Sequence, residues 1–229
     1  MAGPQRIAVA GSGRMGQAIA RRIDECRDQV LAGLWSRGDD LDELLEKSDV
    51  LIDFSMPGAT RTVVEAALAH SVPLVCGVTG LGDEELELVD GAADSIAVVF
   101  DRNMSLGVAV LDTVLADAAA ALGPEFAVTI HETHHKHKQD APSGTALKLG
   151  ETVVAARGSQ ADEPVYESER RGEVPGDHEV RFESATERLS FAHSVTTRDV
   201  FADGALRAAH WVATRSPGRY SMRDVLSGE

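Results

Sequence analysis

The sequence predicts an α/β protein, with a doubly wound parallel sheet followed by a second α+β domain whose sheet is mostly antiparallel. Three observations support this prediction. A short apolar run at residues 6–10 leads directly into a glycine-rich turn. Up to residue 100, apolar runs of strand length alternate with helical patterns. After residue 103 the pattern changes to a long alanine-rich helix and then to segments of alternating polarity.

The first strand, at residues 6–10, is followed by the pattern G-x-G-x-x-G and by a helix at residues 17–26. Gly11 permits the tight turn, Gly13 lets the backbone approach a pyrophosphate, and Gly16 lets the helix pack closely on the strand. The N–H groups at the start of the helix then face the phosphates. Strand, glycine motif and helix in this order predict a Rossmann-type dinucleotide site. Its predicted contacts are Gly11, Gly13, Arg14, Met15 and Gly16.

The second strand, at residues 30–35, ends without the acidic residue that usually binds the ribose hydroxyls of NAD. Ser36 and Arg37 stand there instead, and both side chains suit a 2′-phosphate. The alternative is that Arg37 lies in a solvated turn before Asp39 and Asp40. The cofactor is therefore NADPH or NADH, and Arg37 favours NADPH.

The remaining elements of the first domain continue the alternation. Strands are expected at 50–54, 73–76 and 96–100, and helices at 41–45, 59–70 and 83–93. Ligands of such sheets bind beyond the carboxyl ends of the strands. The loops at those ends, at 54–57, 77–80 and 102–105, are therefore candidates for cofactor contact, and Phe54 begins the first of them.

The second domain is expected over residues 104–202, and the first, at 1–103, is completed by 203–229. Helices are predicted at 106–122 and from Ser143 to about residue 157, strands at 126–132, 178–182 and 189–195, and a polar stretch at 158–176. A last helix, at 202–215 with Asp203 as its N-cap, returns to the first domain.

The composition limits the partners and the compartment. A net charge of −15 argues against a basic surface for nucleic acid and against attraction to anionic membranes. Two cysteines indicate no disulfide framework. The sequence shows no signal-peptide pattern and no apolar run of membrane-spanning length. A cytoplasmic protein with a small-molecule substrate is expected.

The segment 131–145 carries the predicted chemistry, because four of the eight histidines fall within seven of its residues. Ser143 is a good N-cap, so the N–H groups of Gly144 and Thr145 form an anion site sized for a carboxylate. Histidines beside it can move a proton near neutral pH, and Lys138 can donate one or bind a second carboxylate. The spacing does not decide which histidine is the acid. A carboxylate pocket with proton donors and a hydride carrier suggests reduction of an unsaturated, acid-bearing substrate.

Four alternatives remain at this point. The histidines could bind zinc, although their spacing matches no standard zinc motif and no metal is expected. They could lie on a polar surface loop without a role. A dinucleotide-sensing or metal-binding protein without turnover, or an enzyme acting on another imine or enoate dicarboxylate, would also fit.

The segment 132–145, Glu-Thr-His-His-Lys-His-Lys-Gln-Asp-Ala-Pro-Ser-Gly-Thr, closely resembles the signature of the 4-hydroxy-tetrahydrodipicolinate reductase (dihydrodipicolinate reductase) family. The likeness covers nearly the whole chain, which resembles a compact form of that family. Further similar motifs are found at 13–16, 53–57, 76–80, 103–107, 174–180, 201–205 and 222–226.

The resemblance implies NADPH- or NADH-dependent reduction of a cyclic dicarboxylate to tetrahydrodipicolinate, in diaminopimelate and lysine biosynthesis. It implies that His134 is the general acid/base and Lys138 a proton donor. It further implies a homotetramer joined through the sheets of the second domain. The substrate contacts implied by the resemblance are His135, Ser143, Gly144 and Thr145. The cofactor contacts that it implies in the later loops are Gly77, Thr79, Asn103 and Met104.

Overall fold

The chain forms two compact units in the computed structural model, which describes residues 3–158 and 162–228. Unit 1 comprises residues up to Leu106 together with those from Arg198 onward, and unit 2 comprises residues 107–197. The predicted boundaries at 103 and 203 fall three residues before Leu106 and five after Arg198. The second of them lies inside a helix, α7 (Asp199–Val212), which unit 1 keeps whole.

Unit 1 is built on a six-stranded parallel sheet in the order β10-β5-β4-β3-β1-β2, which confirms the predicted doubly wound fold. Its strands are β1 (Gln5–Ala10), β2 (Gln29–Trp35), β3 (Val50–Asp53), β4 (Leu74–Cys76), β5 (Ala97–Phe100) and β10 (Gly218–Tyr220). The sequence did not predict β10, because three residues with a single aromatic carry no apolar run. Strand order reverses beside β1, and such reversals are where ligands bind in these sheets.

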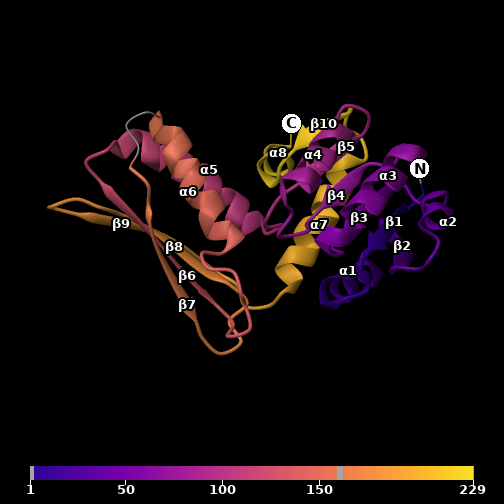
Figure 1. Ribbon diagram of the computed structural model, residues 1–229, viewed down its shortest axis with the longest axis horizontal. Coiled ribbons are helices and arrows are strands. Elements are labelled where there is room, and N and C mark those ends of the chain that lie inside the picture. Colours follow the sequence, from indigo (N-terminus) through magenta and orange to yellow (C-terminus); the bar gives the residue numbers. More distant parts are fainter. Residues whose placement is uncertain (1–2, 159–161, 229) are drawn as a thin grey trace. The chain divides into compact units, whose positions relative to one another are not determined.

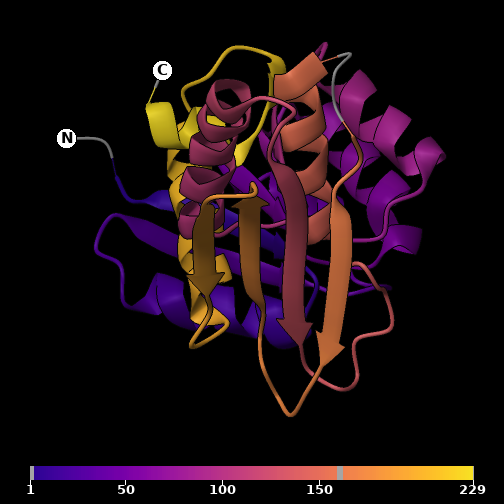
Figure 2. The same ribbon diagram turned by 90° about the vertical axis from the view of Figure 1, so that its left-hand side faces the viewer.

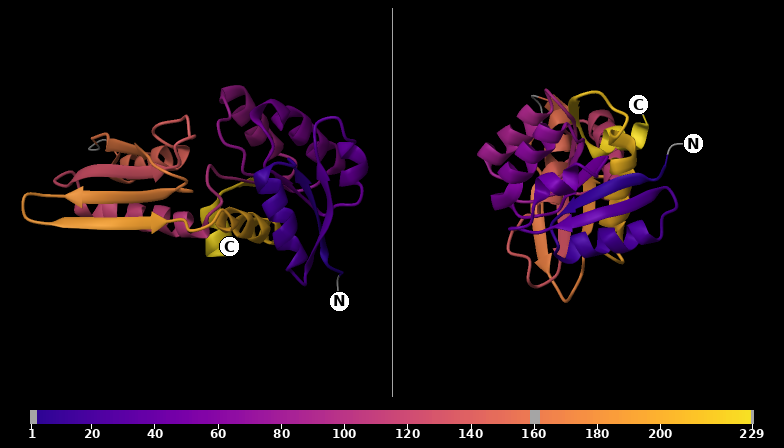
Figure 3. Two further views of the ribbon diagram at one scale, coloured as in Figure 1. Left: turned by 90° about the horizontal axis from the view of Figure 1, so that it is seen from below. Right: turned by 90° about the vertical axis from the view of Figure 1, so that its right-hand side faces the viewer.

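Helices cover both faces of this sheet (Figures 1 and 3). The first face is covered by α1 (Arg14–Asp24) and α7, which pack on each other, and the second by α2 (Leu41–Leu45), α3 (Thr60–His70) and α4 (Asp83–Ala92). A short turn, η1 (Pro57–Ala59), precedes α3, and α8 (Met222–Ser227) ends the described chain. Because both faces are covered, Ile7, Ala8, Val9 and Ala10 are all fully buried. None of the helices among the described residues is long and apolar enough to cross a membrane.

Unit 2 is a four-stranded sheet in the order β7-β6-β8-β9, with two helices on one face (Figure 2). Its elements are α5 (Leu106–Leu122), β6 (Ala127–His134), α6 (Gly144–Arg157), β7 (Val165–Arg170), β8 (Asp177–Glu183) and β9 (Arg188–Ser194). The β6–β7 pairing is parallel and the other two are antiparallel, so the sheet is mostly antiparallel as expected. Leu115, Leu149 and Phe182 are among the fully buried side chains that join the helices to the sheet.

The sequence predicted a polar stretch at 158–176 and no strand within it, whereas the edge strand β7 lies there. One prediction about a helix start was wrong. Asp203 is not an N-cap: Arg198 holds that position in α7. Asp203 lies in the second turn of the helix and accepts a hydrogen bond from Nε of Arg22 on α1 at 2.6 Å. The acidic residue that suggested a helix start therefore forms a salt bridge between α7 and α1.

Candidate active site

The predicted cofactor residues of unit 1 follow neighbouring strands at one edge of the parallel sheet. Backbone hydrogen bonds connect the starts of these loops laterally. Gly11 N–H donates to Trp35 O, Phe54 N–H to Ala10 O, and Gly77 N–H to Asp53 O, each at 2.9 Å. The structure therefore brings the ends of β1, β2, β3 and β4 together, as the strand pattern predicted.

The glycine loop has the geometry that each glycine was expected to need. Gly11 has a φ of 103°, and a Cβ there would lie 2.6 Å from the carbonyl oxygen of Phe54. A Cβ on Gly16 would lie 1.7 Å from the carbonyl oxygen of Gly11, so helix and turn are in direct contact. A Cβ on Gly13 would meet nothing within 4 Å. Gly13 is also the N-cap of α1 and supplies no side-chain cap, which leaves the helix start open to a phosphate.

The side chains after β2 are those on which the prediction of NADPH or NADH depends. Asp39 is turned toward its own loop, where its Oδ2 accepts a hydrogen bond from Ser36 N–H at 2.8 Å. Ser36 Oγ donates to Ser12 Oγ of the glycine loop at 2.6 Å. Arg37 is exposed, and its Nη2 lies 3.7 Å from the position of a Cβ on Gly58. The arginine thus projects from the end of β2 toward the loop after β3.

Four further predicted contacts also lie at this edge of the sheet. The ring of Phe54 covers Gly77, where an added Cβ would come within 2.5 Å of it. Thr79 is exposed, and Asn103 accepts a hydrogen bond from Ser105 N–H at 2.9 Å. Met104 differs, because its side chain is only 1% exposed and packs in the core. A cofactor contact by Met104 stays a prediction.

In unit 2, the inward face of β6 changes from apolar to polar along the strand. Val128 and Ile130 point into the core, and the next two inward residues are Glu132 and His134. Both are buried, with Glu132 at 0% and His134 at 8% exposure. The strand therefore ends in a buried polar cluster directly after the hydrophobic core, so this cluster needs its own hydrogen-bond partners.

Arg170, opposite His134 in the parallel pairing of β6 with β7, supplies those partners. Its Nη2 donates to Glu132 Oε1 at 2.8 Å and its Nη1 to Glu132 Oε2 at 2.9 Å. Nδ1 of His134 is also hydrogen-bonded to Glu132 Oε2. Burial raises the pKa of Glu132, but hydrogen bonds from Arg170, Ser168 and His134 outweigh it and bring that pKa to about 2. Glu132 is therefore ionised across the working pH range.

His134 itself is a neutral base at neutral pH. Burial lowers its pKa below the ordinary value, and the carboxylate of Glu132 offsets this only in part. Since ionised Glu132 can only accept, Nδ1 of His134 carries the proton and Nε2 has the lone pair. A Cβ on Gly176 would lie 3.0 Å from this Nε2, so the glycine keeps the space beside it clear.

The carboxylate cradle predicted at Ser143 is connected to His134 through His178. Ser143 Oγ caps α6 by accepting a hydrogen bond from Ala146 N–H at 3.2 Å, and it lies 3.3 Å from Nε2 of His178. The rings of His178 and His134 meet edge to face with centroids 5.2 Å apart. Burial, with the charge of His134 second, lowers the pKa of His178 to about 3. His178 is thus a neutral ring between His134 and the start of α6.

Lys138 and the remaining histidines of the segment 131–145 differ from one another in burial and in position. Lys138 is half-buried, and its Nζ pairs with Oδ1 of Asp140 at 2.8 Å. His135 follows the strand end at intermediate burial, whereas His137 is exposed. His131 points to the outer face of the sheet, with Nδ1 3.5 Å from Glu167 Oε2. Within residues 3–158 and 162–228, no three histidine, cysteine, aspartate or glutamate side chains are placed to hold one metal ion.

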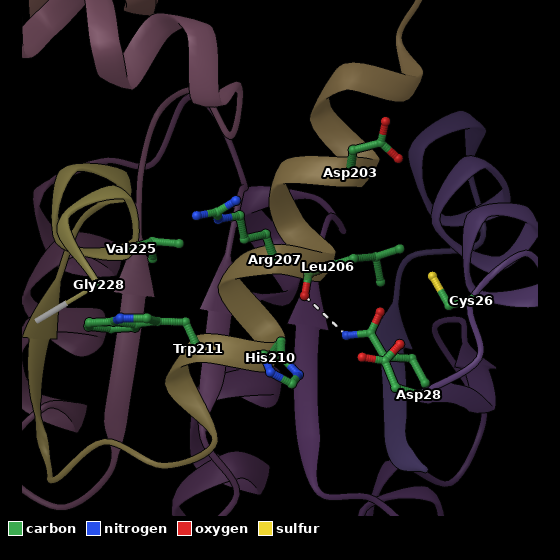
Figure 4. A pocket seen from close by; sticks show the side chains of 10 residues that line it. Cys26, Asp28, Asp203, Leu206, Arg207, His210, Trp211, Val225 and Gly228 are labelled. Atoms are coloured by element: carbon green, nitrogen blue, oxygen red, sulfur yellow. Dashed lines mark hydrogen bonds between the residues drawn. The ribbon is translucent and has the colours of Figure 1, made fainter.

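A surface pocket of about 460 Å³ in unit 1 lies elsewhere (Figure 4). Its lining includes Leu206, His210 and Trp211 of α7, together with Cys26 and Gln29. Gln29 begins β2, so this pocket is at the amino end of the sheet, opposite the glycine loop. None of the predicted site residues lines it.

Three residues of the cluster were missed as functional by the reasoning from residue types. Arg170 lay in the stretch described only as polar, and His178 was placed on a strand without a role. Glu132 was noted only within the family signature. Alternation along β6 places Glu132 and His134 on one face two residues apart, and that signal could have found the carboxylate.

Comparison with known proteins decides the family. Residues 5–104 match the family described as Dihydrodipicolinate reductase, N-terminus, and residues 107–226 match Dihydrodipicolinate reductase, C-terminus. The chain belongs to the dihydrodipicolinate reductase family. It is therefore an oxidoreductase with a pyridine-nucleotide-binding fold.

Relatives in this family match almost the whole chain. The 4-hydroxy-tetrahydrodipicolinate reductase of Zymomonas mobilis is 40% identical over 241 residues, covering 95% of each chain. That of Caulobacter vibrioides is 38% identical over 253 residues, covering 99% of this chain and 98% of the relative. Both alignments are longer than this chain of 229 residues, so the relatives carry insertions, as expected if this chain is a compact member.

A solved structure shares the fold. The dipicolinate-bound dihydrodipicolinate reductase from Paenisporosarcina sp. TG-14 superposes with a TM-score of 0.80 at 22% identity, over 97% of this chain and 100% of that one.

Proposed function

We propose that the protein reduces 4-hydroxy-tetrahydrodipicolinate to tetrahydrodipicolinate in diaminopimelate and lysine biosynthesis, with His134 and Lys138 handling protons. In the overall reaction the substrate loses one water and gains a hydride and a proton. The observation that carries the proposal is the cluster at the end of β6, where a buried neutral histidine adjoins the capped start of α6. The membership in the reductase family supplies the substrate.

Substrate binding is assigned to the start of α6. A dicarboxylate needs donors for its oxygens, and Gly144 and Thr145 present backbone N–H groups before the first intrahelical bond, which Leu147 donates to Ser143 O. The hydroxyl of Ser143 and the ring of His135 complete this set. The buried helix start favours a negative charge at this position.

Proton transfer is assigned to His134 and Lys138. His134 presents the Nε2 lone pair beside Gly176, and it can take up and return a proton because Glu132 stabilises the charged ring. Lys138, held by Asp140 in this structure, donates a proton or binds the second carboxylate once the substrate competes for its ammonium group.

Cofactor binding is assigned to the carboxyl edge of the unit 1 sheet. The open space at Gly13 and the uncapped start of α1 fit a pyrophosphate. When bound there, the nicotinamide supplies the hydride. NADPH is preferred, because Arg37 is exposed at the end of β2 whereas Asp39 is engaged by Ser36. Arg37→Ala should lower kcat/KM for NADPH about tenfold, as expected for one charged hydrogen bond, and leave kcat/KM for NADH within twofold. Equal losses with both coenzymes would remove this role.

A cytoplasmic homotetramer is the proposed form of the protein. The family resemblance supports the tetramer, and so does the outer face of the unit 2 sheet, which α5 and α6 leave uncovered (Figure 2). Cys26 and Cys76 are free thiols, which agrees with a reducing compartment. Light scattering after gel filtration should give four times the 24.3 kDa chain mass. A monomer at micromolar concentration would contradict the assembly but leave the reaction unaffected.

The reaction is tested by adding the protein to freshly prepared 4-hydroxy-tetrahydrodipicolinate and following the oxidation of the coenzyme. A rate that depends on both protein and substrate is expected. The absence of any rate above background, with NADPH and with NADH, would disprove the proposed activity. Turnover of related imine or enoate dicarboxylates at comparable kcat/KM would keep the chemistry and change the substrate.

A further inference from the structure

The end of β6 holds a buried carboxylate, Glu132, that is not among the predicted substrate, cofactor or catalytic residues. Glu132 is fully buried, although an ionised carboxylate is costly to bury without partners. Its position is determined by the strand: it points inward two residues before His134, opposite Ser168 of β7 and His178 of β8. Glu132 thus lies behind the histidine, on the side away from the Nε2 atom that faces Gly176.

Arg170 completes the arrangement from the neighbouring strand. It makes two parallel hydrogen bonds to Glu132, at 2.8 and 2.9 Å, which is the geometry that orients a carboxylate most firmly. The same guanidinium also donates to the backbone carbonyl of Asp140, the residue that pairs with Lys138. One side chain therefore holds both the partner of His134 and the loop that carries Lys138.

We propose that Glu132 and Arg170 are positioning residues for His134: Arg170 orients the Glu132 carboxylate, and Glu132 holds the proton of His134 on Nδ1 so that Nε2 is the reacting atom. This inference rests on the proposed function for its catalytic consequence. A carboxylate behind a histidine fixes the tautomer and stabilises the imidazolium that forms when the ring accepts a proton. Neither positioning residue is among the predicted substrate contacts.

The competing explanation is that the pair only stabilises the fold, as a buried salt bridge. The two explanations differ in what Glu132→Gln should do. A glutamine fills the same space but can donate its amide N–H to Nδ1, which moves the proton to Nε2 and removes the lone pair. A purely structural pair would lower stability without affecting the tautomer or the pH dependence.

The first readout is independent of activity. The ¹⁵N chemical shifts of His134, assigned through His134→Gln, report which nitrogen carries the proton. We expect the Nδ1–H form in the wild-type protein and its loss in Glu132→Gln. The matched control is Glu169→Gln on the outer face of β7, whose carboxylate accepts from Thr133 and does not reach His134. The Nδ1–H form persisting in Glu132→Gln would overturn the inference independently of any activity measurement.

The second readout is kinetic. In Glu132→Gln, kcat should fall about 10²-fold or more while KM stays within threefold, because the substrate contacts are elsewhere. The limb of the pH profile that His134→Gln abolishes should move to lower pH, since Glu132 raises the pKa of His134. Lys138, Arg170 and His178 also face the ring and lower its pKa or are neutral, so they do not compensate. If the wild-type protein had no activity, the proposed function would be wrong, and the inference about the tautomer of His134 would be unaffected. An unmoved limb with kcat within threefold would overturn the positioning role.

Discussion

Ser143→Ala is expected to separate the two roles of the α6 start, because Ser143 both caps the helix and, in the proposed function, contacts a substrate carboxylate. Ser143 is 1% exposed, and its Oγ accepts from Ala146 N–H and lies beside Nε2 of His178. Loss of an N-cap costs about 1 kcal/mol. Nδ1 of His178 has no hydrogen-bond partner among the described residues, so the variant leaves this buried ring without its Ser143 contact as well, at about 1 kcal/mol more.

The expected loss of unfolding free energy is therefore about 2 kcal/mol, or a Tm lower by roughly 4–8 °C for a chain of this size. With dipicolinate, the ligand of the Paenisporosarcina structure, as a probe of the proposed carboxylate site, loss of a hydrogen bond to a charged carboxylate should also weaken binding by about 10- to 100-fold. Calorimetry measures the first effect and titration with dipicolinate the second.

Ser221→Ala is the matched control. Ser221 caps α8 in unit 1 by accepting from Arg223 N–H at 3.2 Å, and no predicted substrate residue lies in that helix. It should lose about 1 kcal/mol and keep wild-type dipicolinate affinity. If Ser143→Ala binds dipicolinate as tightly as Ser221→Ala does, the carboxylate cradle is not at the start of α6.

Three further predictions concern packing and pH. Gly176→Ala places a Cβ 3.0 Å from Nε2 of His134, so kcat should fall at least tenfold, and steady-state kinetics showing a wild-type kcat would mean that Nε2 is not the reacting atom. Burial raises the pKa of Asp53 to about 6, so its contribution to stability is complete below pH 3.8 and is lost as pH rises through 6; Asp53→Asn should therefore increase the unfolding free energy at pH 7 by up to about 3 kcal/mol in urea titrations, and an unchanged value would contradict this. The pKa of Glu132 is lowered from 4.5 to about 2, so its contribution is complete above pH 4.5 and is lost as pH falls toward 2; the wild-type protein should lose more stability between pH 5 and pH 3 than Glu132→Gln, and equal losses in urea titrations would count against the Arg170 pairing.

The first unit could be predicted from the sequence because its signals are local. Each strand from β1 to β5 contains an apolar run, and β3 and β4 are buried throughout. The glycine motif predicts both the turn and the helix after it. The spacing of Gly11, Gly13 and Gly16 predicted a separate role for each glycine. The close approach at Gly16 and the open space at Gly13 agree with those roles. The signal for the start of α6 was equally local, because serine is a residue type that commonly caps helices.

The parts that the sequence did not reveal depend on contacts between distant segments. Strand β7 lies at an edge and alternates Glu167 and Glu169 with Ser168 and Arg170, so it shows no apolar periodicity. Its role becomes visible only when its pairing places Arg170 opposite His134, 36 residues earlier in the chain. Asp203 misled for the same reason: a local rule suggested a cap, and Arg22 on another helix turned out to be its partner.

The central claim is that the end of β6 performs the proton chemistry of the reductase, and His134→Gln together with Lys138→Ala tests it most directly. Steady-state kinetics with 4-hydroxy-tetrahydrodipicolinate and saturating NADPH should show kcat lowered about 10²-fold or more in each variant. The Tm of each variant should stay within a few degrees of the wild-type value. Unchanged kcat in both variants would contradict the claim.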